Sequence, residues 1–123
     1  MHVLLAEDNE LNWEIASALL EARGFLLDWA ENGQVCVEKF SASEPGFYDL
    51  VLMDVRMPVM DGYEAARTLR AMNRPDAGIP IIAMTADAFS EDIQNCMASG
   101  MNAHVAKPLD IKLLMRVIKK YVR

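Results

Sequence analysis

Short apolar runs, each followed by polar residues, recur along the chain at intervals of about twenty to thirty residues. Residues 3–6, 50–53 and 79–84 are apolar without alternation, so both faces of each segment are expected to be covered, as in a buried parallel strand. Residues 25–30, interrupted by Asp28, and residues 103–106 are shorter candidates. The hydrophobic pattern therefore predicts five strands.

Segments with helical spacing and helix-start signals separate these strands. Asn9 can cap a helix that runs to about Arg23, with Leu11, Ile15, Leu19 and Ala22 predicted on its buried face. The other helices are predicted over residues 33–42, 62–72, 90–100 and 110–122, with Asp61, Ser90 and Asp110 at their starts.

Trp13 lies off that predicted face of the first helix, so we expect it to be partly exposed. Packing at the helix flank is the favoured interpretation, and a docking patch for a partner helix is the alternative.

Strands that alternate with helices are typical of a doubly wound parallel sheet. Right-handed crossovers bring the carboxyl ends of all the strands to one edge of that sheet. The residues that end or follow a predicted strand should therefore converge there. They are Glu7, Asp8, Asp54, Thr85 and Lys107.

Length and charge narrow the possible functions. A chain of 123 residues is expected to form one domain, spanning residues 1–123. The net charge of −6 argues against nucleic acid as a partner, and no apolar run is long enough for a membrane span. The start of the chain lacks signal-peptide features, and Cys36 and Cys96 have no metal-ligand spacing, so we expect a cytoplasmic protein with buried thiols.

The converging residues have the chemistry of phosphoryl transfer. Oxygen ligands from several carboxylates suit Mg²⁺, or Mn²⁺ in its place, and an aspartate can act as a nucleophile toward a phosphoryl donor. Lys107 can neutralise phosphoryl charge, and the Thr85 hydroxyl can donate a hydrogen bond. Each residue taken alone is more often a cap, a turn residue or a solvated side chain. The functional interpretation depends on their convergence.

Five sequence segments resemble those of one known family. They are LLAEDN at 4–9, LMDVRMP at 52–58, MDGYE at 60–64, IAMTA at 82–86 and VAKP at 105–108. Over essentially all 123 residues the chain resembles the receiver domains of two-component response regulators. The sequence of these segments is most similar to that of the receivers of hybrid sensor histidine kinases. The resemblance implies a flavodoxin-like sheet with strand order 2-1-3-4-5.

The resemblance also assigns roles to individual residues. Asp54 would accept a phosphoryl group from a phosphohistidine, and Asp8 would bind Mg²⁺ directly, as would the backbone carbonyl of Arg56. Glu7 would bind the ion through water. Thr85 and Lys107 would contact the phosphoryl group, and the peptide bond before Pro108 would be cis. His104 occupies the position of the family's aromatic switch residue, with an edge-strand residue as the equally weighted alternative.

The function that we expect is a signal relay that switches conformation on phosphorylation, with only self-phosphorylating and self-dephosphorylating chemistry. Its expected partners are a histidine kinase or a histidine phosphotransfer protein, and a downstream effector on the face of the fourth helix, fifth strand and fifth helix. An aspartate-nucleophile phosphatase is one alternative, although Arg56 stands where such enzymes need a second acid. A binding module that is never phosphorylated is the other.

Overall fold

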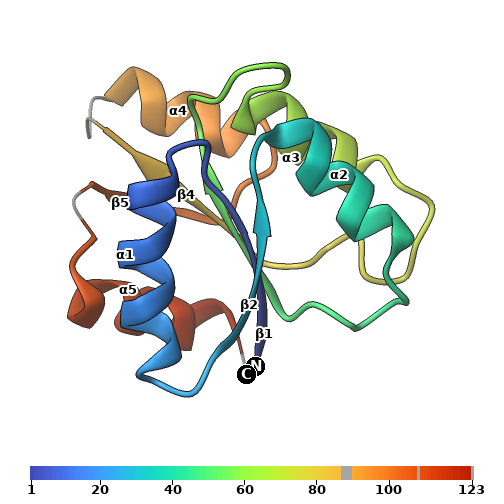
Figure 1. Ribbon diagram of the computed structural model, residues 1–123. Helices are drawn as coiled ribbons and strands as arrows, with labels where there is room; N and C mark the ends of the chain where they lie inside the picture. Colours follow the sequence, from blue (N-terminus) through green and yellow to red (C-terminus); the bar gives the residue numbers. More distant parts are fainter. Residues whose placement is uncertain (87–89, 108, 123) are drawn as a thin grey trace.

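Five parallel strands form one sheet in the order β2-β1-β3-β4-β5, which confirms the predicted fold class and strand order (Figure 1). The computed structural model describes residues 1–86, 90–107 and 109–122, with residues 90–92 described by their backbone alone. The strands are His2–Ala6 (β1), Leu26–Ala30 (β2), Leu50–Asp54 (β3), Ile81–Thr85 (β4) and Ala103–Ala106 (β5).

Four helices connect the strands and a fifth follows β5, as predicted, and their ends differ from the predicted ones by at most two residues. They are Glu10–Glu21 (α1), Gly33–Ala42 (α2), Gly62–Arg70 (α3), Ser90–Ala98 (α4) and Ile111–Tyr121 (α5). The helix α4 begins at Ser90, and the predicted cap at its start lies outside what the structure describes. Within the described parts of the chain, no helix has the length and apolar character needed to cross a membrane.

Side-chain capping starts four of the helices. The side chains of Asn9, Asn32, Asp61 and Asp110 each accept a hydrogen bond from a backbone N–H in the first turn of the following helix. These short polar side chains satisfy N–H groups that have no partner within the helix, which is why the helices begin where they do.

The central strands are buried on both faces, as their uninterrupted apolar runs predict. In β1, Val3 and Leu5 pack toward one face of the sheet and Leu4 toward the other. One core contains side chains from α1 and α5, and the other contains side chains from α2, α3 and α4 (Figure 1). Such double coverage leaves the strand ends as the place where polar groups can gather.

The prediction of which face of α1 is buried was wrong. Leu11 and Ile15 are exposed, with 64% and 53% of their surface accessible, whereas Ala16 and Leu20 are buried. Trp13 lies on this observed core-facing stripe and packs against the same core, half-buried. The first helix carries apolar residues on more than one face, and the small Ala16 allows its backbone to approach the sheet.

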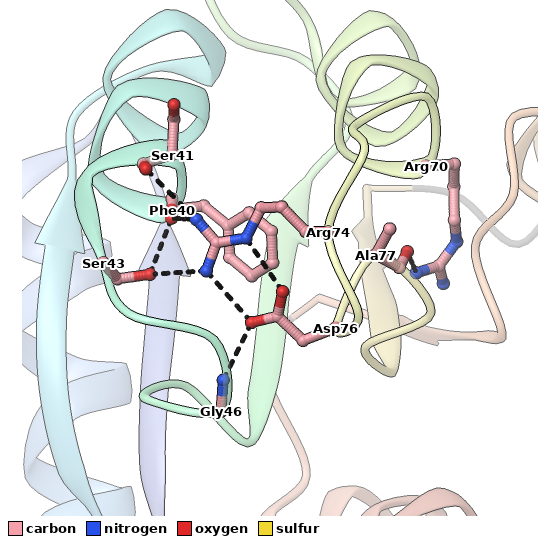
Figure 2. Close-up of polar contacts among 8 residues, drawn as sticks. All are labelled: Phe40, Ser41, Ser43, Gly46, Arg70, Arg74, Asp76 and Ala77. Carbon is pink, nitrogen blue, oxygen red and sulfur yellow. Dashed lines mark hydrogen bonds and ion pairs between the residues drawn. The ribbon is translucent and has the colours of Figure 1, made fainter.

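Arg74 ties the α3–β4 connection to the end of α2 (Figure 2). Its guanidinium lies 4.5 Å from the centroid of the Phe40 ring, donates to the Phe40 and Ser41 carbonyls, and pairs with Asp76 at 2.8 Å. Asp76 in turn accepts the N–H of Gly46 at 3.0 Å. This network lies at the amino edge of the sheet, away from the converging strand ends, and is therefore a structural anchor.

Candidate functional site

Three carboxylates meet at the carboxyl edge of the sheet, where the strand order reverses between β1 and β3. Glu7 and Asp8 follow β1, and Asp54 is the last residue of β3. One carboxylate oxygen from each lies within 4.8 Å of the others. Glu7 and Asp54 are buried, with 3% and 5% of their surface exposed, whereas Asp8 is open to solvent. The predicted convergence of the three acids is confirmed.

Lys107 links two of these acids. Its Nζ donates to Glu7 Oε2 at 2.8 Å and to Asp54 Oδ2 at 2.9 Å. The position follows from the backbone, because Lys107 comes directly after β5 and its N–H donates to the Thr85 carbonyl at 2.7 Å. A cation between two buried carboxylates offsets their mutual repulsion, which makes this cluster stable enough to form.

The cluster shifts the pKa of two of its members. Burial raises the pKa of Glu7, and the negative charge of Asp54 adds to the rise, while the hydrogen bond from Lys107 opposes it. Burial by itself would lower the pKa of Lys107. The hydrogen bonds and charges of Glu7 and Asp54 outweigh burial, so the pKa of Lys107 is raised and the ammonium stays charged.

The loop after β3 holds Asp54 in place. The N–H of Arg56 donates to Asp54 Oδ1 at 3.2 Å, and the N–H of Gly62 donates to the Val55 carbonyl at 3.1 Å. A Cβ on Gly62 would lie 2.3 Å from the Asp54 carbonyl oxygen, so only glycine allows the start of α3 to pack this closely. The sequence identified Gly62 as a helix start but not as a spacer beside Asp54.

Val59, in the same loop, has a strained backbone. Its φ of 70° is unusual for a β-branched residue, and its side chain is 81% exposed. The N–H of Met60 donates to the Pro58 carbonyl at 2.7 Å, which closes a three-residue turn around Val59. Strain at an exposed position beside a buried acid is typical of a functional loop.

Thr85 and His104 lie on the neighbouring strands β4 and β5. Thr85 is buried, and its hydroxyl is 3.5 Å from the Val105 carbonyl, a long hydrogen bond that leaves the hydroxyl weakly held. His104 is half-buried and pairs in register with Ala83. The predicted cis peptide at Pro108 lies outside the described residues.

The donor set fits a hard divalent cation. All three acids offer oxygen, Asp8 faces solvent, and a cleft lined by Asp8, Arg56 and Pro58, among others, reaches the Asp8 side of the cluster. Mg²⁺ uses one or two carboxylates and keeps several waters, which an open site of this kind permits. Lys107 contacts one oxygen of each acid that it bridges, and the other oxygen accepts one backbone N–H, from Asn9 on Glu7 and from Arg56 on Asp54. A carboxylate oxygen has two lone pairs, so each of these oxygens can also face an ion.

Residues 3–119 match the model of the response regulator receiver domain. The chain belongs to this family. A two-component response regulator of Oryza sativa subsp. japonica, ORR41, is 40% identical over 98% of this chain and 94% of its own. The peroxide stress-activated histidine kinase mak1 of Schizosaccharomyces pombe is 38% identical over 94% of this receiver domain, which spans only 7% of the kinase.

Solved receiver domains have the same fold. The receiver domain of sensor histidine kinase PA1611 from Pseudomonas aeruginosa PAO1 superposes with a TM-score of 0.87 at 37% identity, covering 98% of this chain and 95% of that one. That structure holds a magnesium ion in its active site cleft. The receiver domain of Saccharomyces cerevisiae Ssk1, solved with the histidine phosphotransfer protein Ypd1, gives a TM-score of 0.86 at 28% identity, covering 99% and 88% of the two chains.

Proposed function

We propose that this receiver domain accepts a phosphoryl group on Asp54 and relays a signal by changing conformation. The observation that carries the proposal is the position of Lys107, which joins Asp54 to Glu7 while Asp8 lies within 4.8 Å. A buried nucleophilic carboxylate beside a fixed cation is what phosphoryl transfer requires, because the reaction depends on positioning and charge neutralisation.

In the transfer step, a carboxylate oxygen of Asp54 bonds to phosphorus as the bond between phosphorus and the donor's imidazole nitrogen breaks. The ionised carboxylate has no proton to lose, and the departing imidazole takes one from solvent. Lys107 donates to the oxygens that gain charge, and the weakly held Thr85 hydroxyl supports a role as a second donor. Asp8, Asp54 and the Arg56 carbonyl would hold Mg²⁺ directly and Glu7 would hold it through water, and the ion would supply positive charge that neutralises the phosphoryl group.

The partner we propose is a phosphohistidine on a histidine kinase or on a histidine phosphotransfer protein. The relatives among kinases, and the Ssk1 receiver solved with Ypd1, support this assignment. The signalling fold agrees with a relay rather than a metabolic enzyme, and the only chemistry we assign is slow self-phosphorylation and self-dephosphorylation.

The conformational switch that we propose involves Thr85 and His104. Phosphorylation adds charge of about −2 to Asp54 and would draw the Thr85 hydroxyl away from the Val105 carbonyl. The half-buried His104, on the adjacent strand, would then move inward and change the face formed by α4, β5 and α5, where an effector would bind.

Labelling with a small phosphodonor such as phosphoramidate tests the function directly. We expect the wild type to gain one phosphoryl group in the presence of Mg²⁺ and far less after chelation, and Asp54→Asn to gain none. Asp61→Asn is the matched control, since it lies in the same loop and asparagine preserves the helix cap. Incorporation into Asp54→Asn, or steady turnover of a phosphate monoester, would contradict the proposal.

A further inference from the structure

The two tryptophans of the chain stack against each other beside the loop that carries Glu7 and Asp8. Trp13 in α1 and Trp29 in β2 have ring centroids 5.4 Å apart and planes inclined by only 7°. The indole Nε1 of Trp29 donates to the backbone carbonyl of Glu7 at 2.7 Å. An edge-strand side chain thus contacts the main chain of a candidate metal ligand.

The hydrogen bond from Trp29 matters because it holds the peptide group between two candidate metal ligands. The Glu7 carbonyl belongs to the peptide group that joins Glu7 to Asp8, and the Glu7 N–H donates to the Ala30 carbonyl at 3.0 Å. Both ends of Glu7 are therefore held by β2. Fixing this peptide limits the rotation that would otherwise reorient the Glu7 and Asp8 carboxylates relative to each other.

Trp29 is itself well anchored. Its backbone carbonyl accepts a hydrogen bond from Lys39 Nζ, and its ring is covered by Trp13, which projects from the first turns of α1. Stacking restricts the rotamers of the indole, so the Nε1–H stays directed at the Glu7 carbonyl. A surface indole without this contact would donate to water instead.

We propose that Trp29 is a positioning residue for the metal site, acting through the Glu7–Asp8 peptide, and that Trp13 supports it by stacking. The inference rests on the proposed function, because it assumes that the three carboxylates bind Mg²⁺. It goes further by placing a determinant of metal affinity on an edge strand that contributes no ligand.

The test compares Mg²⁺ affinity, measured by calorimetric titration, in the wild type, Trp29→Phe and Trp13→Phe. Phenylalanine keeps an aromatic face but lacks the N–H donor. We expect Trp29→Phe to weaken Mg²⁺ binding roughly 3- to 10-fold, the range that one hydrogen bond supplies. Trp13→Phe retains the Trp29 hydrogen bond and leaves an aromatic ring over Trp29, so its effect on Mg²⁺ affinity should be smaller than that of Trp29→Phe. A folded Trp29→Phe variant with wild-type affinity would overturn the inference.

A measurement on the unaltered protein covers the case in which Trp29→Phe does not fold. The nitrogen-15 NMR spectrum should show two indole N–H signals, the Trp29 signal exchanging more slowly with solvent and moving further than that of Trp13 as Mg²⁺ is added. A Trp29 signal unmoved at saturating Mg²⁺ overturns the inference alone. A wild type that binds no Mg²⁺ overturns this inference and the proposed metal site together.

Discussion

Replacing Lys107 with methionine tests the electrostatic core of the site. The substitution keeps a side chain of similar length but removes the ammonium that joins Glu7 and Asp54. Both acids are almost fully buried, so water cannot easily take over the role of the lost cation. We therefore expect the variant to be less stable than the wild type when Mg²⁺ is absent, and to bind Mg²⁺ more tightly.

The size of the effect follows from the contacts. Two charge-assisted hydrogen bonds are lost, each worth about 1.5–3 kcal/mol, and removing one partner of a buried ion pair commonly costs about 3–5 kcal/mol. Glu7 can relieve part of this cost by taking up a proton, because burial already raises its pKa. The free energy of unfolding at pH 7 should therefore fall by about 2–4 kcal/mol, which lowers the melting temperature by roughly 10 °C.

The difference in stability between the wild type and Lys107→Met should change with pH in a definite direction. The raised pKa of Lys107 means that its stabilising contribution is complete below the ordinary lysine pKa of 10.5 and is lost only as the pH rises through the folded-state value. Between pH 5 and 7 the wild-type cluster keeps its cation. In the variant, Glu7 has a raised pKa and no cation beside it. The folded protein therefore becomes less stable as the pH rises through that pKa, so the difference in stability from the wild type should grow from pH 5 to pH 7.

Urea unfolding without Mg²⁺ measures the deficit, and calorimetric titration measures Mg²⁺ affinity, which we expect to rise about 10-fold as the competing charge is removed. Lys112→Met is the control, since Lys112 is exposed on α5 and its loss changes the net charge equally. A Lys107→Met variant within about 1 kcal/mol of the wild type at pH 7 would refute the reasoning, because a buried pair of acids must then lack the repulsion inferred here.

Three further predictions concern the backbone at Gly62 and Val59 and the ion pair of Asp76 with Arg74. Gly62→Ala should lower the free energy of unfolding by more than about 2 kcal/mol and slow labelling of Asp54, because its Cβ would lie 2.3 Å from the Asp54 carbonyl oxygen. Val59→Asn should raise the free energy of unfolding, measured in urea, by about 0.5–1 kcal/mol, because asparagine tolerates the positive φ of 70°. Asp76→Asn should make the folded protein less stable near neutral pH, because the hydrogen bond from Arg74 lowers the pKa of Asp76. This loss of stability should vanish as the pH falls below 3.8 and through the folded-state pKa, as urea unfolding at several pH values would measure.

Matched variants separate these effects from general damage. Gly78→Ala adds a methyl group where no atom lies within 4 Å, so it should leave stability unchanged, and equal losses in the two alanine variants would contradict the steric argument. A Val59→Asn variant no more stable than the wild type would show that the turn is not strained. In an Arg74→Gln background the pH-dependent effect of Asp76→Asn should shrink to the part that the Gly46 N–H supplies, and an undiminished effect would contradict the role given to Arg74.

Much of the fold and of the site follows from the order of residues alone. The uninterrupted run of residues 50–53 predicts a strand covered on both faces, and β3 is such a strand. Because right-handed crossovers place all strand carboxyl ends together, the residues that end or follow β1, β3 and β5 could be predicted to meet. They do, and Lys107 lies at hydrogen-bond distance from both Asp54 and Glu7, although the sequence separates Lys107 from Glu7 by 100 residues.

Only the tertiary structure decided which faces and partners were used. The apolar stripe of Leu11 and Ile15 was as plausible for burial as that of Ala16 and Leu20, and the choice depends on how closely the helix approaches the sheet. Likewise, nothing in the sequence indicates that the Trp29 indole contacts the Glu7 carbonyl. Local patterns determine the type and direction of each element, whereas such contacts depend on the shapes and volumes of side chains that meet only after folding.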